Sequence, residues 1–159
     1  MGYFNPILQY GVEEFCAKCS EIGIDGLIIP DLPVNEYNER YKAIFEKYDI
    51  INVLLVTPQT SEKRIRFIDD ISKGFIYMVS TTGVTGSTSG FGKEHLDYFD
   101  KIAAFNLKSP QITGFGIKDK LTFSQASNKS KGAIIGSAFI KTLTAEGIKG
   151  IAPFIKSIR

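Results

Sequence analysis

The chain has 159 residues, of which 43% are apolar and 23% are charged, and its formal net charge is +2. These values are typical of an ordinary globular protein, and we expect a single domain over residues 1–159. They exclude an intrinsically disordered chain, and 19 basic against 17 acidic residues exclude nucleic-acid binding driven by bulk charge. The sequence contains neither an apolar stretch of about 18 residues nor a secretory signal, so we expect a cytoplasmic location.

The first clear helical pattern carries the only two cysteines of the chain. Apolar residues recur there at the spacing of one helix face, at Val12, Phe15, Cys16, Cys19 and Ile22. The C-x-x-C spacing also allows a zinc or a redox site, but zinc needs about four ligands and the chain adds only one histidine. Because the apolar face carries both thiols, we expect them to be small hydrophobic groups in the core.

A short apolar run, a loop and a helical segment then follow one another repeatedly. The predicted strands are 26–30, 53–56, 75–79, 111–114 and 133–136. They are continuously apolar, which is typical of parallel strands covered on both faces. Amphipathic stripes predict helices between them, at Tyr37, Tyr41, Ile44, Phe45 and Tyr48, at Ile65, Ile68 and Ile71, and at Leu96, Phe99, Ile102 and Ala103. Two more helices are predicted over 119–129 and after Gly150.

This alternation predicts an α/β fold with a parallel sheet and right-handed crossovers. Two architectures remain open. One is a flavodoxin-like open sheet of five strands, and the other is part of a (β/α)₈ barrel, which needs about 250 residues when complete. Strand order separates them, because a barrel fragment pairs its strands sequentially and a flavodoxin-like sheet has the order 2-1-3-4-5.

Glycines follow two neighbouring predicted strands at the carboxyl ends, where such folds bind their ligands. Gly114-Phe115-Gly116 follows the fourth strand, and Gly136-Ser137 follows the fifth and enters a helix. Glycines let backbone N–H groups approach an anion, and a helix N-terminus adds partial positive charge. The pair of turns therefore predicts a phosphate-binding site. The alternative is that these glycines serve only tight turns.

Acid–base chemistry at carbon needs a placed acid and a placed base, and the residues supply few candidates. Asp31 follows the first strand directly, although it could instead form a turn between Pro30 and Pro33. Asp25 lies at the other end of that strand and is interpreted as structural. His95, at a helix start, is predicted to be solvated.

Several of these segments form an ordered set along the chain: 3–6, 26–33, 75–80 running into Gly83-Val84-Thr85-Gly86, 114–117 and 136–138. Together they resemble the tryptophan synthase alpha subunit family over essentially the whole chain. That family folds as a (β/α)₈ barrel, so the resemblance implies an incomplete TIM barrel of about five βα units after a stub of the third strand. It also implies a lyase of tryptophan biosynthesis, which cleaves indole-3-glycerol phosphate to indole and glyceraldehyde 3-phosphate.

The resemblance implies roles for individual residues. Substrate binding is implied for Ile28, Tyr77, Thr85, Gly86, Gly114, Phe115, Gly116, Gly136 and Ser137. Most would hold the phosphate through backbone N–H groups. In addition, Tyr77 would reach into the pocket, Thr85 would lie on a closing loop, and Ile28 would line the indole pocket. Asp31 would face a beta subunit in an alpha2-beta2 assembly.

The family's catalytic Glu and Asp lie in a motif on the second barrel strand and its loop, and these 159 residues contain no such motif. We therefore expect no catalytic acid–base pair here and little lyase turnover by the chain alone. No metal is expected, and the resemblance implies no cofactor, because pyridoxal phosphate belongs to the beta subunit. Lys118-Asp119-Lys120 departs from the family's usual helix start, although Asp119 could still cap. Two alternatives are a non-catalytic module that binds phosphate or the beta subunit, and a different phosphate-binding α/β protein.

Overall fold

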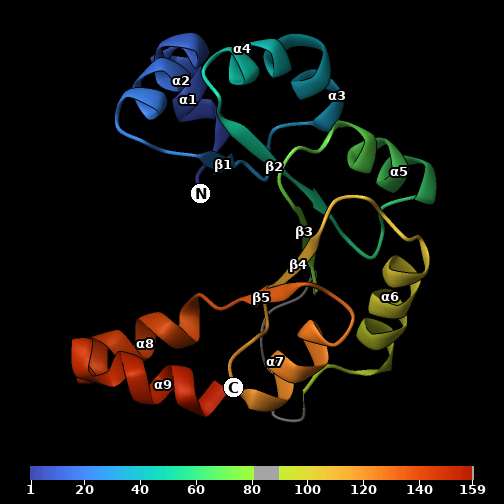
Figure 1. The fold of residues 1–159 in the computed structure, drawn as a ribbon, viewed down its shortest axis with the longest axis vertical. Helices are drawn as coiled ribbons and strands as arrows, with labels where there is room; N and C mark the ends of the chain where they lie inside the picture. The colour runs from blue at the N-terminus through green and yellow to red at the C-terminus, as the bar shows by residue number, and fades with distance from the viewer. Residues whose placement is uncertain (81–89, 159) are drawn as a thin grey trace. The chain divides into compact units, whose positions relative to one another are not determined.

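The computed structural model describes residues 1–80 and 90–158 (Figure 1). Two compact units divide the chain. The first unit comprises Met1–Leu55 with Ser61–Ile76, and the second comprises Val56–Thr60 with Tyr77–Arg159. The single domain expected over residues 1–159 stays a prediction. Within the described ranges, the structure contains no helix with the length and apolar character needed to cross a membrane.

The strand order is β1-β2-β3-β4-β5, which is also the order along the chain. The strands are β1 Gly26–Ile28, β2 Ile51–Val56, β3 Ile76–Val79, β4 Gln111–Gly114 and β5 Gly132–Ile134. The β1–β2 and β4–β5 pairs are parallel. A sequential order is the one expected of a barrel and not of a flavodoxin-like sheet, so it supports the predicted incomplete TIM barrel.

The first unit contains helices on both sides of β1 in the chain. They are α1 Phe4–Tyr10, α2 Val12–Glu21, α3 Val34–Glu36, the π-helical segment η1 Tyr37–Tyr41, α4 Lys42–Lys47 and α5 Glu62–Ile71. Cys16 and Cys19 are buried in its core as predicted, and burial raises the pKa of the Cys16 thiol to about 11. Ile22 departs from the predicted stripe because α2 has already ended there, which leaves its side chain 61% exposed.

The predicted helix over the tyrosine-rich stripe is split by the wider turn of η1. Tyr37 packs edge-on against Phe45, with ring centroids 5.4 Å apart, while Tyr41 packs against Phe4 at 5.2 Å. A π turn rotates the residues that follow it relative to a regular helix. The stripe therefore contacts two sets of partners, which a strict helical period does not predict.

The second unit contains the remaining helices: α6 Lys93–Ala104, α7 Lys120–Ser127, α8 Ser137–Glu146, the 3₁₀ turn η2 Ile148–Gly150 and α9 Ile151–Ile158. In α6 the buried face is formed by Tyr98, Phe99 and Ile102, and the predicted Leu96 lies at the edge of this face with 36% exposure. The helices α8 and α9 lie side by side at the red end of the chain (Figure 1), and the Phe139 and Phe154 rings pack against each other with centroids 6.0 Å apart.

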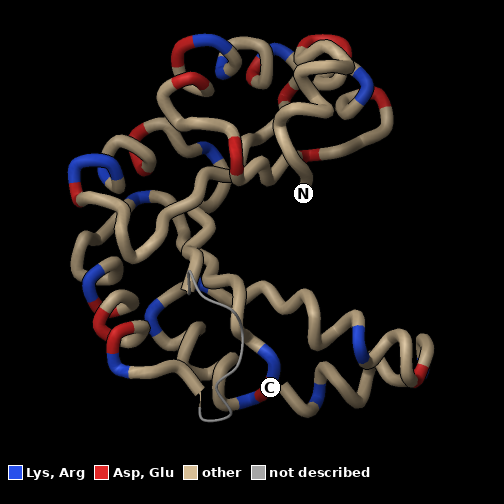
Figure 2. The backbone as a smooth tube through the Cα atoms, turned by 180° about the vertical axis from the view of Figure 1, so that it is seen from behind, with Lys and Arg blue, Asp and Glu red and all other residues tan. Residues whose placement is uncertain are grey.

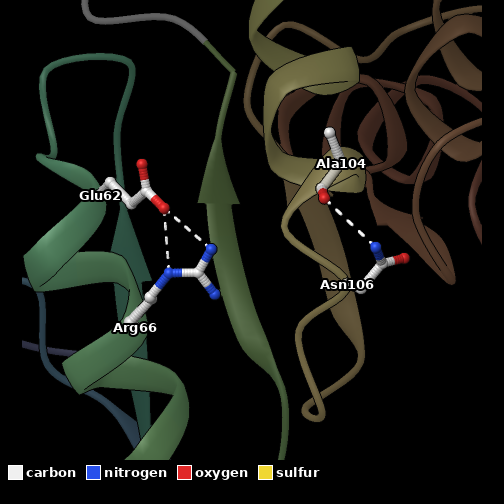
Figure 3. A network of polar contacts seen from close by, with 4 residues as sticks. All are labelled: Glu62, Arg66, Ala104 and Asn106. Atoms are coloured by element: carbon white, nitrogen blue, oxygen red, sulfur yellow. Dashed lines mark hydrogen bonds and ion pairs between the residues drawn. The ribbon is translucent and has the colours of Figure 1, made fainter.

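Charged residues lie mainly in the helices and turns, whereas the strands are largely uncharged (Figure 2). Figure 3 shows two local polar contacts of this surface. In α5, Arg66 binds one carboxylate oxygen of Glu62 through Nε at 3.0 Å and Nη2 at 2.8 Å. After α6, the Asn106 amide donates to the Ala104 carbonyl at 3.3 Å. These contacts stabilise helix surfaces and do not define a site.

Candidate functional site

The two glycine turns predicted from the sequence follow paired parallel strands. In the β4–β5 register, Ile112 faces Gly132 and Gly114 faces Ile134. Parallel strands leave a sheet at the same edge, so the residues after Gly114 and after Ile134 begin as neighbours. The two turns on which the predicted phosphate site depends therefore start from neighbouring strand ends.

The turn after β4 contains two successive residues in the left-handed region of the backbone. Phe115 has a φ of +69° and Gly116 a φ of +72°. Glycine adopts this conformation readily, but a residue with a side chain loses about 1–3 kcal/mol there. Such strain persists only where neighbouring groups hold it, and it concentrates at binding and catalytic sites.

A buried serine at the end of β3 contacts this strained turn. The Ser80 side chain is fully buried, and its Oγ lies 2.7 Å from the Gly114 carbonyl oxygen and 2.5 Å from that of Phe115. The Ser80 N–H also donates to the Gly114 carbonyl at 3.0 Å. Sequence analysis did not single out Ser80. The available signal was a polar residue placed directly after a buried strand.

Tyr77 packs against the same turn from β3. Its side chain is 4% exposed, and its ring centroid lies 5.8 Å from that of Phe115. A Cβ atom added to Gly114 would lie only 1.8 Å from the Tyr77 hydroxyl oxygen, so the tyrosine needs glycine at that position. Burial raises the pKa of the Tyr77 hydroxyl above its ordinary value of 10.

Helix α7, which follows this turn, is capped by its own side chains. The Asp119 carboxylate accepts from the Thr122 N–H at 2.9 Å, and the Thr122 hydroxyl oxygen accepts from the Asp119 N–H at 3.1 Å. This is a reciprocal capping box, and the expected cap at Asp119 is confirmed. The Thr122 side chain, followed by the Thr122 N–H, holds the pKa of Asp119 below its ordinary value of 3.8.

Helix α8, which follows β5, begins differently. Its cap position is Gly136, and within the described part of the chain no side chain caps its first turn. Gly136 and Ser137 are both exposed. The first N–H groups of a helix lack intrahelical partners and carry a partial positive charge. A helix of ten residues with an open, exposed start can therefore accept an anion.

Two predicted site residues, Ile28 and Asp31, belong to the first unit. Ile28 ends β1, and its carbonyl accepts from the Gly2 N–H at 3.1 Å. Asp31 is exposed, and its two carboxylate oxygens lie 2.9 and 3.1 Å from the Phe4 nitrogen, at the start of α1. A hollow of about 240 Å³ beside Asp31 is lined by the loop after β1, by β2 and by α5.

Thr85 and Gly86 lie outside the described residues. His95, predicted to be solvated, is half-buried: its ring is tilted over Phe91 at 5.6 Å, and its Nδ1 is buried with no hydrogen-bond partner among the described residues. In residues 1–80 and 90–158, no three His, Cys, Asp or Glu side chains are grouped as metal ligands would be.

The strand order and the neighbouring glycine turns define a protein of the (β/α)-barrel class, with a candidate anion site at the carboxyl edge of β4 and β5. The family model described as Tryptophan synthase alpha chain matches residues 1–153. The chain therefore belongs to the tryptophan synthase alpha chain family, a family of lyases.

Relatives support this assignment at the level of sequence and of structure. The tryptophan synthase alpha chain of Flavobacterium johnsoniae is 66% identical over 159 residues, which are all of this chain and 63% of the relative. That of Christiangramia forsetii is 60% identical over the same length, 62% of the relative. The tryptophan synthase A-subunit structure from Pyrococcus furiosus has a TM-score of 0.80 at 30% identity, covering 98% of this chain and 62% of that one. The chain thus spans somewhat less than two thirds of these relatives.

Proposed function

We propose that these residues form the phosphate-binding side of a tryptophan synthase alpha active site, whose substrate is indole-3-glycerol phosphate. The supporting observation is the parallel pairing of β4 with β5, because the Gly114–Gly116 and Gly136–Ser137 turns then start from neighbouring strand ends. Family membership supplies the reaction, a carbon–carbon cleavage that releases indole and glyceraldehyde 3-phosphate. The proposed cellular location is the cytoplasm.

The phosphate would be bound mainly by backbone groups. On the β4 side, the donors would be N–H groups of Phe115 and Gly116, and on the β5 side, those of Gly136 and Ser137 at the open start of α8. The helix dipole favours a dianion at this place, so the proposed binding does not depend on a lysine or arginine side chain. Tyr77 would form the neighbouring pocket wall, and Ile28 would contact the indole ring.

Cleavage itself requires a proton for the indole ring and removal of a proton from the glycerol hydroxyl. The proposed site residues include no carboxylate for either step, and Asp31 is used at the start of α1. A placed general acid or base contributes about 10²–10⁴ in rate. We therefore propose that these 159 residues bind the phosphate group but give negligible turnover by themselves.

The proposed partner is a tryptophan synthase beta subunit, in an alpha2-beta2 type of assembly. The loop after β1 would face this partner, because Asp31 is exposed on it beside the hollow of the first unit. No cofactor is proposed for this chain, since pyridoxal phosphate would be held by the beta subunit.

A calorimetric titration with glycerol 3-phosphate, with glycerol as the matched control, tests the phosphate site. We expect saturable binding of the phosphate ester and none of glycerol, because only the ester carries the anion. A sensitive indole-release assay on the same sample should stay at background. Substantial indole release would contradict the proposal that these residues give negligible turnover by themselves. Absence of glycerol 3-phosphate binding would contradict the proposed phosphate site. Co-purification with a tryptophan synthase beta chain tests the partner.

A further inference from the structure

Ser80 contacts two consecutive peptide groups of the turn after β4. Its hydroxyl lies within hydrogen-bond distance of the Gly114 and Phe115 carbonyl oxygens, at 2.7 and 2.5 Å, and its single proton can be donated to one of them at a time. The Ser80 N–H supplies a second donor to Gly114 at 3.0 Å. Both carbonyls can therefore be satisfied at once, by N–H and O–H donors of the same buried residue.

Anchoring these carbonyls fixes the N–H groups that follow them. A peptide group is planar and trans, so its C=O and N–H bonds point in opposite directions. With the Gly114 and Phe115 carbonyls directed at Ser80, the N–H groups of Phe115 and Gly116 are directed away from it. These are the β4-side donors of the proposed phosphate site.

The conformation that Ser80 holds is one that Phe115 does not adopt readily. Its φ of +69° is unfavourable for a residue with a Cβ atom. Packing of its ring compensates only in part, because the ring contacts Tyr77 on one side, with centroids 5.8 Å apart, while the residue remains 46% exposed. The hydrogen bond from Ser80 to the Phe115 carbonyl is therefore the contact best placed to hold the turn.

We propose that Ser80 is a positioning residue, which holds the Phe115–Gly116 turn in its left-handed form and thereby directs two backbone N–H groups at the substrate phosphate. This inference rests on the proposed phosphate-binding function. Ser80 acts through the turn and does not itself contact the substrate.

Ser80→Ala removes the hydroxyl without adding bulk, and Ser130→Ala is the matched control. Ser130 Oγ likewise lies within hydrogen-bond distance of two backbone carbonyl oxygens, those of Ala126 and Gly132 at 2.8 Å each, and it accepts from the Thr113 hydroxyl at 3.2 Å, but it lies at the opposite end of β5. We expect S80A to bind glycerol 3-phosphate about five- to tenfold more weakly than the parent, as loss of one well-placed hydrogen bond implies. S130A should bind within about twofold of the parent.

Repeating the Ser80→Ala substitution in a Phe115→Gly variant distinguishes a positioning role of Ser80 from a simple packing role. Glycine adopts the left-handed conformation without steric cost, so Phe115→Gly removes the strain that Ser80 is proposed to hold. In the F115G background, S80A should therefore reduce affinity by less than about twofold. The same fold-loss in both backgrounds, or no loss in either, would overturn the positioning role.

The backbone of Phe115 can also be followed directly by NMR. The coupling between its amide and α protons, with the corresponding nuclear Overhauser effect, should report a positive φ in the parent and S130A and a negative φ in S80A. An unchanged positive φ in S80A would overturn the inference. Failure of the parent itself to bind glycerol 3-phosphate would overturn the proposed function instead, and it would be recognised because S80A would still change these Phe115 signals.

Discussion

Helices α7 and α8 follow neighbouring strands of the same pair but begin in opposite ways. The start of α7 is closed by its own sequence, because Asp119 and Thr122 exchange hydrogen bonds across the first turn. The start of α8 is open, because Gly136 offers no side chain to its first N–H groups. The first N–H groups of α7 are therefore satisfied by side chains of the helix itself, whereas those of α8 are left open.

This difference indicates how the segments after β4 and after β5 would each contribute to anion binding. On the β5 side, the helix end itself would be the donor. On the β4 side, the capped helix has fewer donors left, so the contribution would come from the left-handed turn at Phe115 and Gly116. A helix start is thus an anion site only when its own sequence leaves it free.

Among the substitutions considered, the largest loss of stability on the β4 side is expected at Gly114. Gly114→Ala would place a Cβ 1.8 Å from the buried Tyr77 hydroxyl, so the strand or the tyrosine must move. We expect the free energy of unfolding to fall by about 2–3 kcal/mol, measured by urea denaturation. Gly132→Ala is the control, because a Cβ there meets no atom within 4 Å. Equal stability of the two variants would show that Tyr77 does not require this glycine.

The β5 side can be closed by giving α8 a cap of its own. Gly136→Asp would place a carboxylate at the first-turn N–H groups, where a Cβ meets no atom within 4 Å. We expect stability to rise by only a few tenths of a kcal/mol, and binding of glycerol 3-phosphate to weaken by about tenfold or more through competition and like-charge repulsion. Gly136→Ala adds the Cβ without the charge and should bind more tightly than G136D. Unchanged affinity of G136D would exclude α8 from the site.

Removing the cap of α7 should have the opposite effects from adding one to α8: it should change stability more than phosphate binding. Asp119→Ala removes the acceptor of the Thr122 N–H and should lower the free energy of unfolding by about 1 kcal/mol. Its affinity for glycerol 3-phosphate should remain within about twofold of the parent. Lys120→Ala changes an exposed neighbour and should shift stability by less than about 0.5 kcal/mol. A large loss of phosphate binding in D119A would contradict the division of roles between α7 and α8.

The pH dependence of this cap should be small and of defined sign. The pKa of Asp119 is lower in the folded chain than its ordinary value of 3.8, so the charged cap stabilises the fold fully above that pH. This stabilisation is lost as the pH falls through the lowered pKa. The stability difference between the parent and D119A should therefore narrow well below pH 3.8, compared with its value at neutral pH. A constant difference across this range would show that charge contributes nothing to the cap.

The fold was largely predictable because local sequence patterns determine its strands and most of its helices. Apolar runs predicted every strand, and the resemblance of several ordered segments predicted their sequential order. The errors occurred at places that a regular period does not describe. Ile22 lies just past a helix end, and Tyr41 is the last residue of a π turn and packs against Phe4.

The candidate site was only partly predictable because its decisive contacts are distant in sequence. The glycines at 114, 116 and 136 were identifiable from their places after strands. Ser80 was not, because its hydroxyl bonds lie 34 and 35 residues away. The left-handed Phe115 depends on that same distant contact, and the buried Nδ1 of His95 likewise reflects tertiary packing that a helix-start pattern does not reveal.

The most direct measurement is a residue-resolved NMR titration of the chain with glycerol 3-phosphate. If the open helix and the strained turn bind the phosphate group, the backbone amides of Gly116 and Ser137 should show the largest shift changes, with a common saturation curve. The capped Thr122 amide should change little. Largest changes at Thr122, or no saturable change at Gly116 and Ser137, would contradict the assignment of a phosphate site to these two turns.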